Sequence, residues 1–124
     1  MANRCVLVVE DEADLVATYE RLLRRHGYRV VSAGSREAGL AALKEEPPHL
    51  LIADLRLSDG DGLDVVRAAR ALPTPTPVIV VSAFASNESR NAALAAGASA
   101  VLAKPFSTDA FAKLIQAVLA PAVC

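Results

Sequence analysis

The chain has 124 residues, of which 53% are hydrophobic and 22% charged, and its formal net charge is -1. This composition excludes a disordered segment, and the near balance of basic and acidic residues argues against direct binding to nucleic acid. Its apolar runs are far too short to span a membrane. With no signal-peptide pattern and two cysteines at opposite ends, Cys5 and Cys124, we expect a cytoplasmic protein without disulfides.

Five short, nearly continuous apolar runs predict β-strands that are buried on both faces, as in a parallel sheet. The predicted strands are residues 5–9, 29–31, 50–53, 78–81 and 100–103. The last has the weakest strand propensity, because it contains two alanines among four residues.

Segments with helical spacing separate these runs. The first places Leu15, Tyr19, Leu22 and Leu23 on one face and ends near Gly27, a suitable C-cap. The third begins near Leu63. Serines that can cap a helix N-terminus precede the second, fourth and fifth helices. They are Ser35, Ser86 and Ser107.

This alternation predicts an α/β fold in which residues 1–124 form a single (βα)5 domain, a doubly wound parallel five-stranded sheet with helices on both faces. The common, flavodoxin-like strand order of such a domain is 2-1-3-4-5. Strands 1 and 3 then flank the topological switch point, and ligands bind there beyond the carboxyl ends of the strands. The residues that follow each strand are therefore the candidates for function.

Polar side chains stand at four of these strand ends. Strand 1 is followed by Glu10 and Asp11, strand 3 by Asp54, strand 4 by Ser82 and strand 5 by Lys104. Each alone is common in a turn or helix cap, but their occurrence together in this order indicates a site. Two carboxylates about 4 Å apart repel by roughly 4 kcal/mol at an effective dielectric constant of about 20, so the cluster either holds protons or binds a cation.

The candidate ligands are all oxygen atoms, and oxygen ligands around an open cleft favour Mg²⁺. The ammonium of Lys104 can bind phosphoryl oxygens, and the hydroxyl of Ser82 can donate a hydrogen bond to another of them. Asp54 is then the nucleophile that forms an aspartyl phosphate. These residues predict Mg²⁺-dependent chemistry on a phosphoryl group.

Over essentially its whole length the chain resembles the receiver domains of bacterial response regulators in two-component signalling. The matching stretches are VLVVEDE at residues 6–12, LIADLRL at 51–57, DGL at 61–63, VVSA at 80–83, AGAS at 96–99 and KPF at 104–106. The resemblance implies a switch that accepts a phosphoryl group from a sensor histidine kinase or a histidine phosphotransfer protein. It implies no enzyme beyond slow self-dephosphorylation, and it leaves the output domain or protein unknown.

The resemblance also implies a role for each site residue. Asp54 is the implied phosphoacceptor, Lys104 pairs first with Asp54 and then with the phosphoryl group, and Ser82 moves toward that group after transfer. The Lys104–Pro105 peptide bond is expected to be cis, a form that X-Pro bonds adopt readily.

The implied Mg²⁺ ligands are Glu10, Asp11, Asp54 and the backbone carbonyl of Arg56. Gly62 resembles the glycine that lets the loop after the phosphoacceptor turn into the third helix. Leu15 resembles an apolar position that contacts the kinase.

Three departures from the family pattern stand out. Ser58 replaces a common proline, which predicts a looser loop after Asp54. Val101 replaces a common Tyr or Phe, which argues against a switch that couples an aromatic residue to Ser82. Arg56 and Phe84 flank the site, and their bulk predicts a phosphoaspartate that outlives that of a fast chemotaxis-type regulator.

Two other classes of function are alternatives. A phosphatase of the haloacid-dehalogenase type usually has a second Asp two residues after its nucleophile, where this chain has Arg56, and the chain has no room for a cap domain. A pseudo-receiver that acts as a phosphorylation-independent interaction module would have an incomplete acidic cluster. Here the cluster is complete, and Val101 is the feature that favours this alternative.

Overall fold

The computed structural model describes residues 4–83 and 86–119. Five strands form one parallel sheet, and they are β1 (Cys5–Val9), β2 (Arg29–Ala33), β3 (Leu50–Asp54), β6 (Val78–Ser82) and β7 (Ala100–Ala103). Their order across the sheet is β2-β1-β3-β6-β7. This is the predicted order 2-1-3-4-5 of the five strands, so the predicted doubly wound α/β fold is confirmed.

Three strands extend further than the sequence predicted. β2 continues to Ala33, and the last residues of β3 and β6 are Asp54 and Ser82. In the register of the sheet, Asp54 is paired with Val81 and Ser82 with Ala103. The apolar run stops before these polar residues, but the ladder uses backbone groups that they also possess. Strand geometry therefore sets the direction of both side chains.

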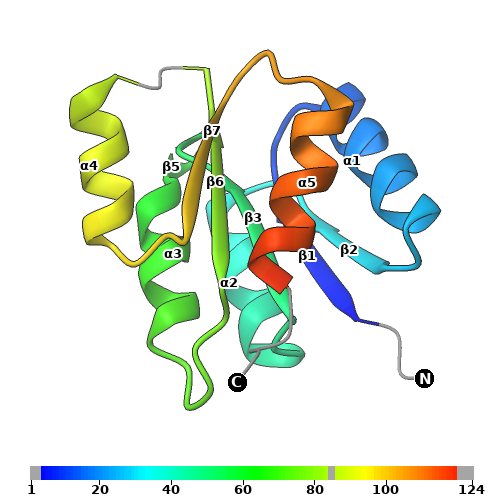
Figure 1. The fold of residues 1–124 in the computed structure, drawn as a ribbon. Helices are drawn as coiled ribbons and strands as arrows, with labels where there is room; N and C mark the ends of the chain where they lie inside the picture. Colours follow the sequence, from blue (N-terminus) through cyan, green and yellow to red (C-terminus); the bar gives the residue numbers. More distant parts are fainter. Residues whose placement is uncertain (1–3, 84–85, 120–124) are drawn as a thin grey trace, which may run out of the picture.

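Five helices connect the strands, and they are α1 (Ala13–Arg25), α2 (Arg36–Glu45), α3 (Gly62–Arg70), α4 (Asn87–Ala95) and α5 (Thr108–Leu119). Figure 1 shows α1 and α5 on one face of the sheet and α2, α3 and α4 on the other. The three predicted serine caps, Ser35, Ser86 and Ser107, each accept a backbone N–H hydrogen bond at 3.0–3.1 Å. Gly27, after α1, has a φ of 88°, as expected for a glycine cap.

Alternating strand residues divide the core into two layers. The buried residues of the first, called the α1/α5 layer, are Val6, Val8, Tyr19, Leu22, Leu23, Leu50, Ile52, Ile79, Val81, Phe111 and Ile115. Those of the second, called the α2–α4 layer, are Leu7, Val9, Ala33, Leu43, Leu51, Ala53, Leu57, Val65, Val66, Ala69, Val78, Val80, Ala93 and Ala98. The same alternation shows on which side of the sheet a residue at the end of a strand lies.

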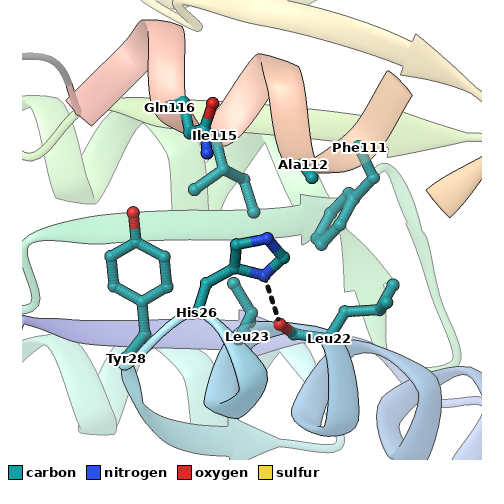
Figure 2. A pocket seen from close by; sticks show the side chains of 8 residues that line it. All are labelled: Leu22, Leu23, His26, Tyr28, Phe111, Ala112, Ile115 and Gln116. Carbon is teal, nitrogen blue, oxygen red and sulfur yellow. Dashed lines mark hydrogen bonds between the residues drawn. The ribbon is translucent and has the colours of Figure 1, made fainter. Parts of the chain in front are cut away.

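The C-terminal end of α1 packs against α5. His26 caps α1, and its Nδ1 donates a hydrogen bond to the carbonyl oxygen of Leu22 at 2.9 Å. Figure 2 shows the imidazole between α1 and the side chains of Phe111 and Ile115 from α5, with Tyr28 beside it. These contacts give His26 a structural role at the seam between the two helices.

A short antiparallel ribbon, β4 (Arg56–Leu57) and β5 (Gly60–Asp61), follows β3 and was not predicted. In its turn, the carboxylate of Asp59 accepts hydrogen bonds from the backbone N–H groups of Arg36 and Glu37 at 2.7 and 3.0 Å. The ribbon is thereby joined to the N-terminus of α2, where negative charge is favourable. Within the described ranges, no helix is long and apolar enough to cross a membrane.

Candidate functional site

Three carboxylates meet beyond the carboxyl ends of β1 and β3. Val9 is paired with Ala53 in these adjacent strands, so the residues that follow them lie side by side. Carboxylate oxygens of Glu10, Asp11 and Asp54 all lie within 4.8 Å of one another. Glu10 and Asp54 are only 2% and 8% exposed, whereas Asp11 is exposed. The expected convergence of the carboxylates at the topological switch point is confirmed.

Lys104 bridges two of these carboxylates from the end of β7. Its Nζ donates hydrogen bonds to Glu10 Oε1 at 2.9 Å and to Asp54 Oδ2 at 3.0 Å. Its backbone N–H donates to the carbonyl oxygen of Ser82 at 2.9 Å. The bond between Lys104 and Pro105 is cis, as predicted. Side chains that lie far apart in the sequence therefore form one charged cluster, which consists of Glu10, Asp11, Asp54 and Lys104.

The electrostatics of the cluster favour an added cation. Burial raises the pKa of Glu10 to about 7 in spite of the hydrogen bond from Lys104, and the charge of Asp54 adds to the increase. Burial also disfavours the charge of Lys104, but its bonds to Glu10 and Asp54 outweigh this and raise its pKa. An ionised Glu10 is thus costly here. A divalent cation would relieve that cost, and a donor set made only of carboxylate oxygens fits a hard cation such as Mg²⁺.

The loop after β3 orients the other two carboxylates. The backbone N–H of Ser58 donates to Asp11 Oδ2 at 3.1 Å, and that of Arg56 donates to Asp54 Oδ1 at 3.1 Å. A proline has no N–H group, so a proline at position 58 could not orient Asp11 in this way. The replacement of proline by Ser58 therefore supplies a hydrogen bond to the site.

Gly62, the first residue of α3, lies against the strand end that carries Asp54. A Cβ atom here would be 1.9 Å from the carbonyl oxygen of Asp54 and 2.9 Å from the Cα atom of Leu55. The N–H of Gly62 donates to the carbonyl oxygen of Leu55 at 2.8 Å, which closes the loop. Glycine is required because of this close approach, and the expected place of Gly62 in the turn into the third helix is confirmed.

Ser82 lies on the other side of the sheet from Glu10 and Asp54. It is 1% exposed and continues the side of Val78 and Val80, which belong to the α2–α4 layer. It lines a hollow between the β4–β5 ribbon and α4, beside the hollow that holds Asp54. The structure therefore places Ser82 at the edge of the charged cluster.

The remaining candidates surround the cluster. Arg56 lines both hollows and so lies between them. Leu15 lines a separate hollow together with Lys104 and Phe106. Phe84, predicted to flank the site, lies outside the described residues. Sequence reasoning placed Tyr19 only in the core, although its ring stacks on that of Phe106.

Three carboxylates and a lysine lie at the switch point of a doubly wound parallel sheet, which is where α/β domains of this class bind ligands. Comparison with known proteins gives the family. The sequence model of the response regulator receiver domain matches residues 6–116. The chain therefore belongs to the response regulator receiver domain family, whose members are phosphoacceptors in two-component signalling and not enzymes in the ordinary sense.

Similar proteins support the same assignment. The chain is 38% identical over 114 residues to the transcriptional regulatory protein PrrA of Mycobacterium tuberculosis, a match that covers 92% of this chain and 49% of PrrA. It is 38% identical over 112 residues to KdpE of the same organism, with coverage of 90% and 49%. The chain thus spans about half the length of these relatives.

Solved structures share the fold. A CheY-like receiver domain protein from Methanospirillum hungatei superposes with a TM-score of 0.90 at 28% identity, over 95% of this chain and 94% of that one. The receiver domain of the sensor histidine kinase PA1611 of Pseudomonas aeruginosa gives a TM-score of 0.86 at 28% identity, over 97% and 100%. The PA1611 structure contains a magnesium ion coordinated in its active-site cleft.

Proposed function

We propose that Asp54 accepts a phosphoryl group from a phosphohistidine of a sensor histidine kinase or a histidine phosphotransfer protein, and that this switches an output partner. The observation that carries the proposal is the bridge from Lys104 Nζ to Asp54 and to the buried Glu10. An ammonium held against a carboxylate at a strand end serves as a ready binding group for phosphoryl oxygens.

The residues that would hold Mg²⁺ are Glu10, Asp11, Asp54 and the backbone carbonyl of Arg56. The three acidic residues support this proposal, because their carboxylate oxygens lie within 4.8 Å of one another. The ion in the active-site cleft of the PA1611 receiver domain supports it by analogy. When bound, Mg²⁺ supplies positive charge to the oxygens of the transferring group and lowers the repulsion between that group and the carboxylates.

The protein's own part in the reaction follows from its hydrogen bonds. An oxygen of Asp54 attacks the phosphorus atom, an O–P bond forms, the N–P bond of the donor breaks, and the imidazole leaves with the electron pair. Lys104 then exchanges the Asp54 carboxylate for a phosphoryl oxygen, because that oxygen carries more charge. Ser82, at the edge of the site, donates a hydrogen bond to another phosphoryl oxygen.

The product carries close to two negative charges, which shifts a pre-existing equilibrium between inactive and active conformations. The relatives PrrA and KdpE are named transcriptional regulatory proteins, and by analogy we propose that the output is control of a cytoplasmic partner. The pseudo-receiver alternative is not favoured, because the acidic cluster and its lysine are complete.

The test is phosphorylation by acetyl phosphate, read by intact mass, for the wild type and for Asp54→Asn. The proposal expects an adduct of one phosphoryl group on the wild type that depends on Mg²⁺ and is absent from Asp54→Asn. A wild type that neither binds Mg²⁺ nor gains mass would overturn it and favour an interaction module. An adduct that persists in Asp54→Asn would place the acceptor elsewhere.

A further inference from the structure

Tyr19 in α1 has a buried hydroxyl that is unpartnered. The residue is 1% exposed, and within the described part of the chain its hydroxyl has no hydrogen-bond partner. Buried hydroxyl groups in proteins nearly always have a partner, because an unpaired one has lost its water without compensation. A persistent exception points to a partner that arrives in another state of the protein.

The charged cluster lies on the side of the sheet against which Tyr19 packs. Val6 and Val8 of β1 belong to the α1/α5 layer, and Glu10 continues their alternation. On β3, Leu50 and Ile52 belong to the same layer and Asp54 continues it. The pKa of Tyr19 is raised by burial, and next by the charges of Glu10 and Asp54. The phenol is therefore a neutral donor near two carboxylates.

The ring of Tyr19 also supports the segment that carries Lys104. It stacks on Phe106, with ring centroids 5.8 Å apart and planes inclined by 11°, and it contacts Phe111 at 5.3 Å. The rings of Phe106 and Phe111 are stacked 5.3 Å apart. Phe106 is two residues after Lys104. The three rings thus connect α1, the loop after β7 and α5 directly beside the charged cluster.

We propose that Tyr19 stabilises the phosphorylated state, in which it donates a hydrogen bond to the Glu10 carboxylate once Lys104 has moved to the phosphoryl group. This inference rests on the function proposed above. In the unphosphorylated protein, Lys104 donates hydrogen bonds to both Glu10 and Asp54. When Lys104 binds a phosphoryl oxygen, Glu10 loses that donor while still buried, and among the described residues Tyr19 has an unpartnered donor on the same side.

The chain contains two tyrosines and no tryptophan, so one substitution isolates the signal of Tyr19. In Tyr28→Phe, the tyrosine absorption band and the tyrosine emission come from Tyr19 alone. Tyr28 lies beside His26 at the seam of α1 and α5, which makes the change remote from the charged cluster. A phenol that begins to donate to a carboxylate changes its absorption and emission.

The experiment adds Mg²⁺ and acetyl phosphate to Tyr28→Phe and follows the Tyr19 spectrum and the intact mass together. We expect a spectral change that rises with the phosphoryl adduct and does not occur in Asp54→Asn/Tyr28→Phe. An adduct without any spectral change overturns the role of Tyr19 and leaves the proposed function intact. If no adduct forms, the proposed function fails and the role of Tyr19 fails with it.

Tyr19→Phe tests the consequence, because it keeps the stacked ring and removes only the hydroxyl. At a fixed acetyl phosphate concentration, we expect the ratio of phosphorylated to unphosphorylated protein to fall about fivefold, the equivalent of one lost hydrogen bond, with little change in the initial rate. Tyr28→Phe is the matched control and should keep the wild-type ratio. Equal ratios in both variants would overturn the inference.

Discussion

The two layers of the molecule differ in shape and in chemistry. The described aromatic side chains all belong to the α1/α5 layer or pack against it, and they are Tyr19, Tyr28, Phe106 and Phe111. The α2–α4 layer is aliphatic and closely fitted. At Gly39 of α2, a Cβ atom would lie 2.9 Å from Cγ2 of Val9. One side of the sheet therefore holds large flat rings, and the other holds aliphatic side chains that leave no room for a methyl group at Gly39.

The residues of the candidate site divide in the same way. Glu10 and Asp54 lie on the α1/α5 side, whereas Ser82 continues the α2–α4 side and Val101 packs against that layer. Many receivers have an aromatic residue at the position of Val101, and this chain has an aromatic stack on the opposite side instead. A change in charge at Asp54 therefore acts first on the α1/α5 layer, because Asp54 lies on that side of the sheet.

The largest effect on the rate of phosphorylation is expected from removing the ammonium of Lys104, which lies on the α1/α5 side of the sheet. Lys104→Gln should slow phosphorylation by acetyl phosphate about 10²–10³-fold, the loss typical of removing one preorganised donor to a reacting oxygen. The measurement is the initial rate of adduct formation by intact mass in the presence of Mg²⁺. Lys113→Gln is the control, because Lys113 pairs with Asp109 on the surface at 76% side-chain exposure. If Lys104→Gln reacted as fast as Lys113→Gln, the bridge would have no part in the reaction.

The contact between Asp54 and the α2–α4 layer is tested by Gly62→Ala. The added Cβ would overlap the carbonyl oxygen of Asp54 at 1.9 Å, so we expect a loss of about 3 kcal/mol in the free energy of unfolding, the upper end for an overpacked site. Urea unfolding measures it. Gly34→Ala is the matched control, since beyond its chain neighbours no atom lies within 4 Å of its added Cβ. Equal stability of the two variants would contradict the close approach seen here.

Most of the fold and the charged cluster could be predicted from the sequence, for reasons that particular residues illustrate. Continuous apolar runs marked the strands, and the rule that ligands bind at strand ends singled out Glu10, Asp54 and Lys104. The β4–β5 ribbon could not be predicted, because strands of two residues have no periodicity. The bond from Asp59 to α2 spans 23 residues and leaves no local signal.

The part played by Tyr19 was also hidden in the sequence. Its spacing from Leu15 and Leu22 marks an apolar position on the first helix, and this interpretation is right for the ring. The environment of the hydroxyl could not be predicted in this way, because it depends on how far α1 lies from β1 and on where Phe106 packs. A periodic pattern identifies a buried face but not the unpaired polar atom within it.

The pH dependence of stability should report the burial of Glu10. Its pKa in the folded protein is about 7, above the ordinary 4.5, so the folded state holds a proton that the unfolded state releases between these values. In the metal-free protein, the contribution of Glu10 to the free energy of unfolding is therefore fully present below pH 4.5. This contribution is lost as the pH rises through about 7. Urea unfolding between pH 5 and 8, compared with Glu10→Gln, measures it. Saturating Mg²⁺ should remove the decline, and a Glu10→Gln variant with the same decline as the wild type would exclude Glu10 as its source.

The smallest effect is expected on the lifetime of the phosphoaspartate, from removing the side chain of Arg56. Arg56 lines both the hollow of Asp54 and that of Ser82, so its removal should admit water to the phosphoryl group. We expect a wild-type phosphoaspartate that persists well beyond seconds, and a lifetime shortened a few-fold in Arg56→Ala, measured as loss of the adduct after the acetyl phosphate is removed. Arg24→Ala, at an exposed ion pair with Glu20 on α1, is the matched control and should decay like the wild type. Loss of the wild-type adduct within seconds would contradict screening altogether. Equal decay of both variants would assign the lifetime to something other than Arg56.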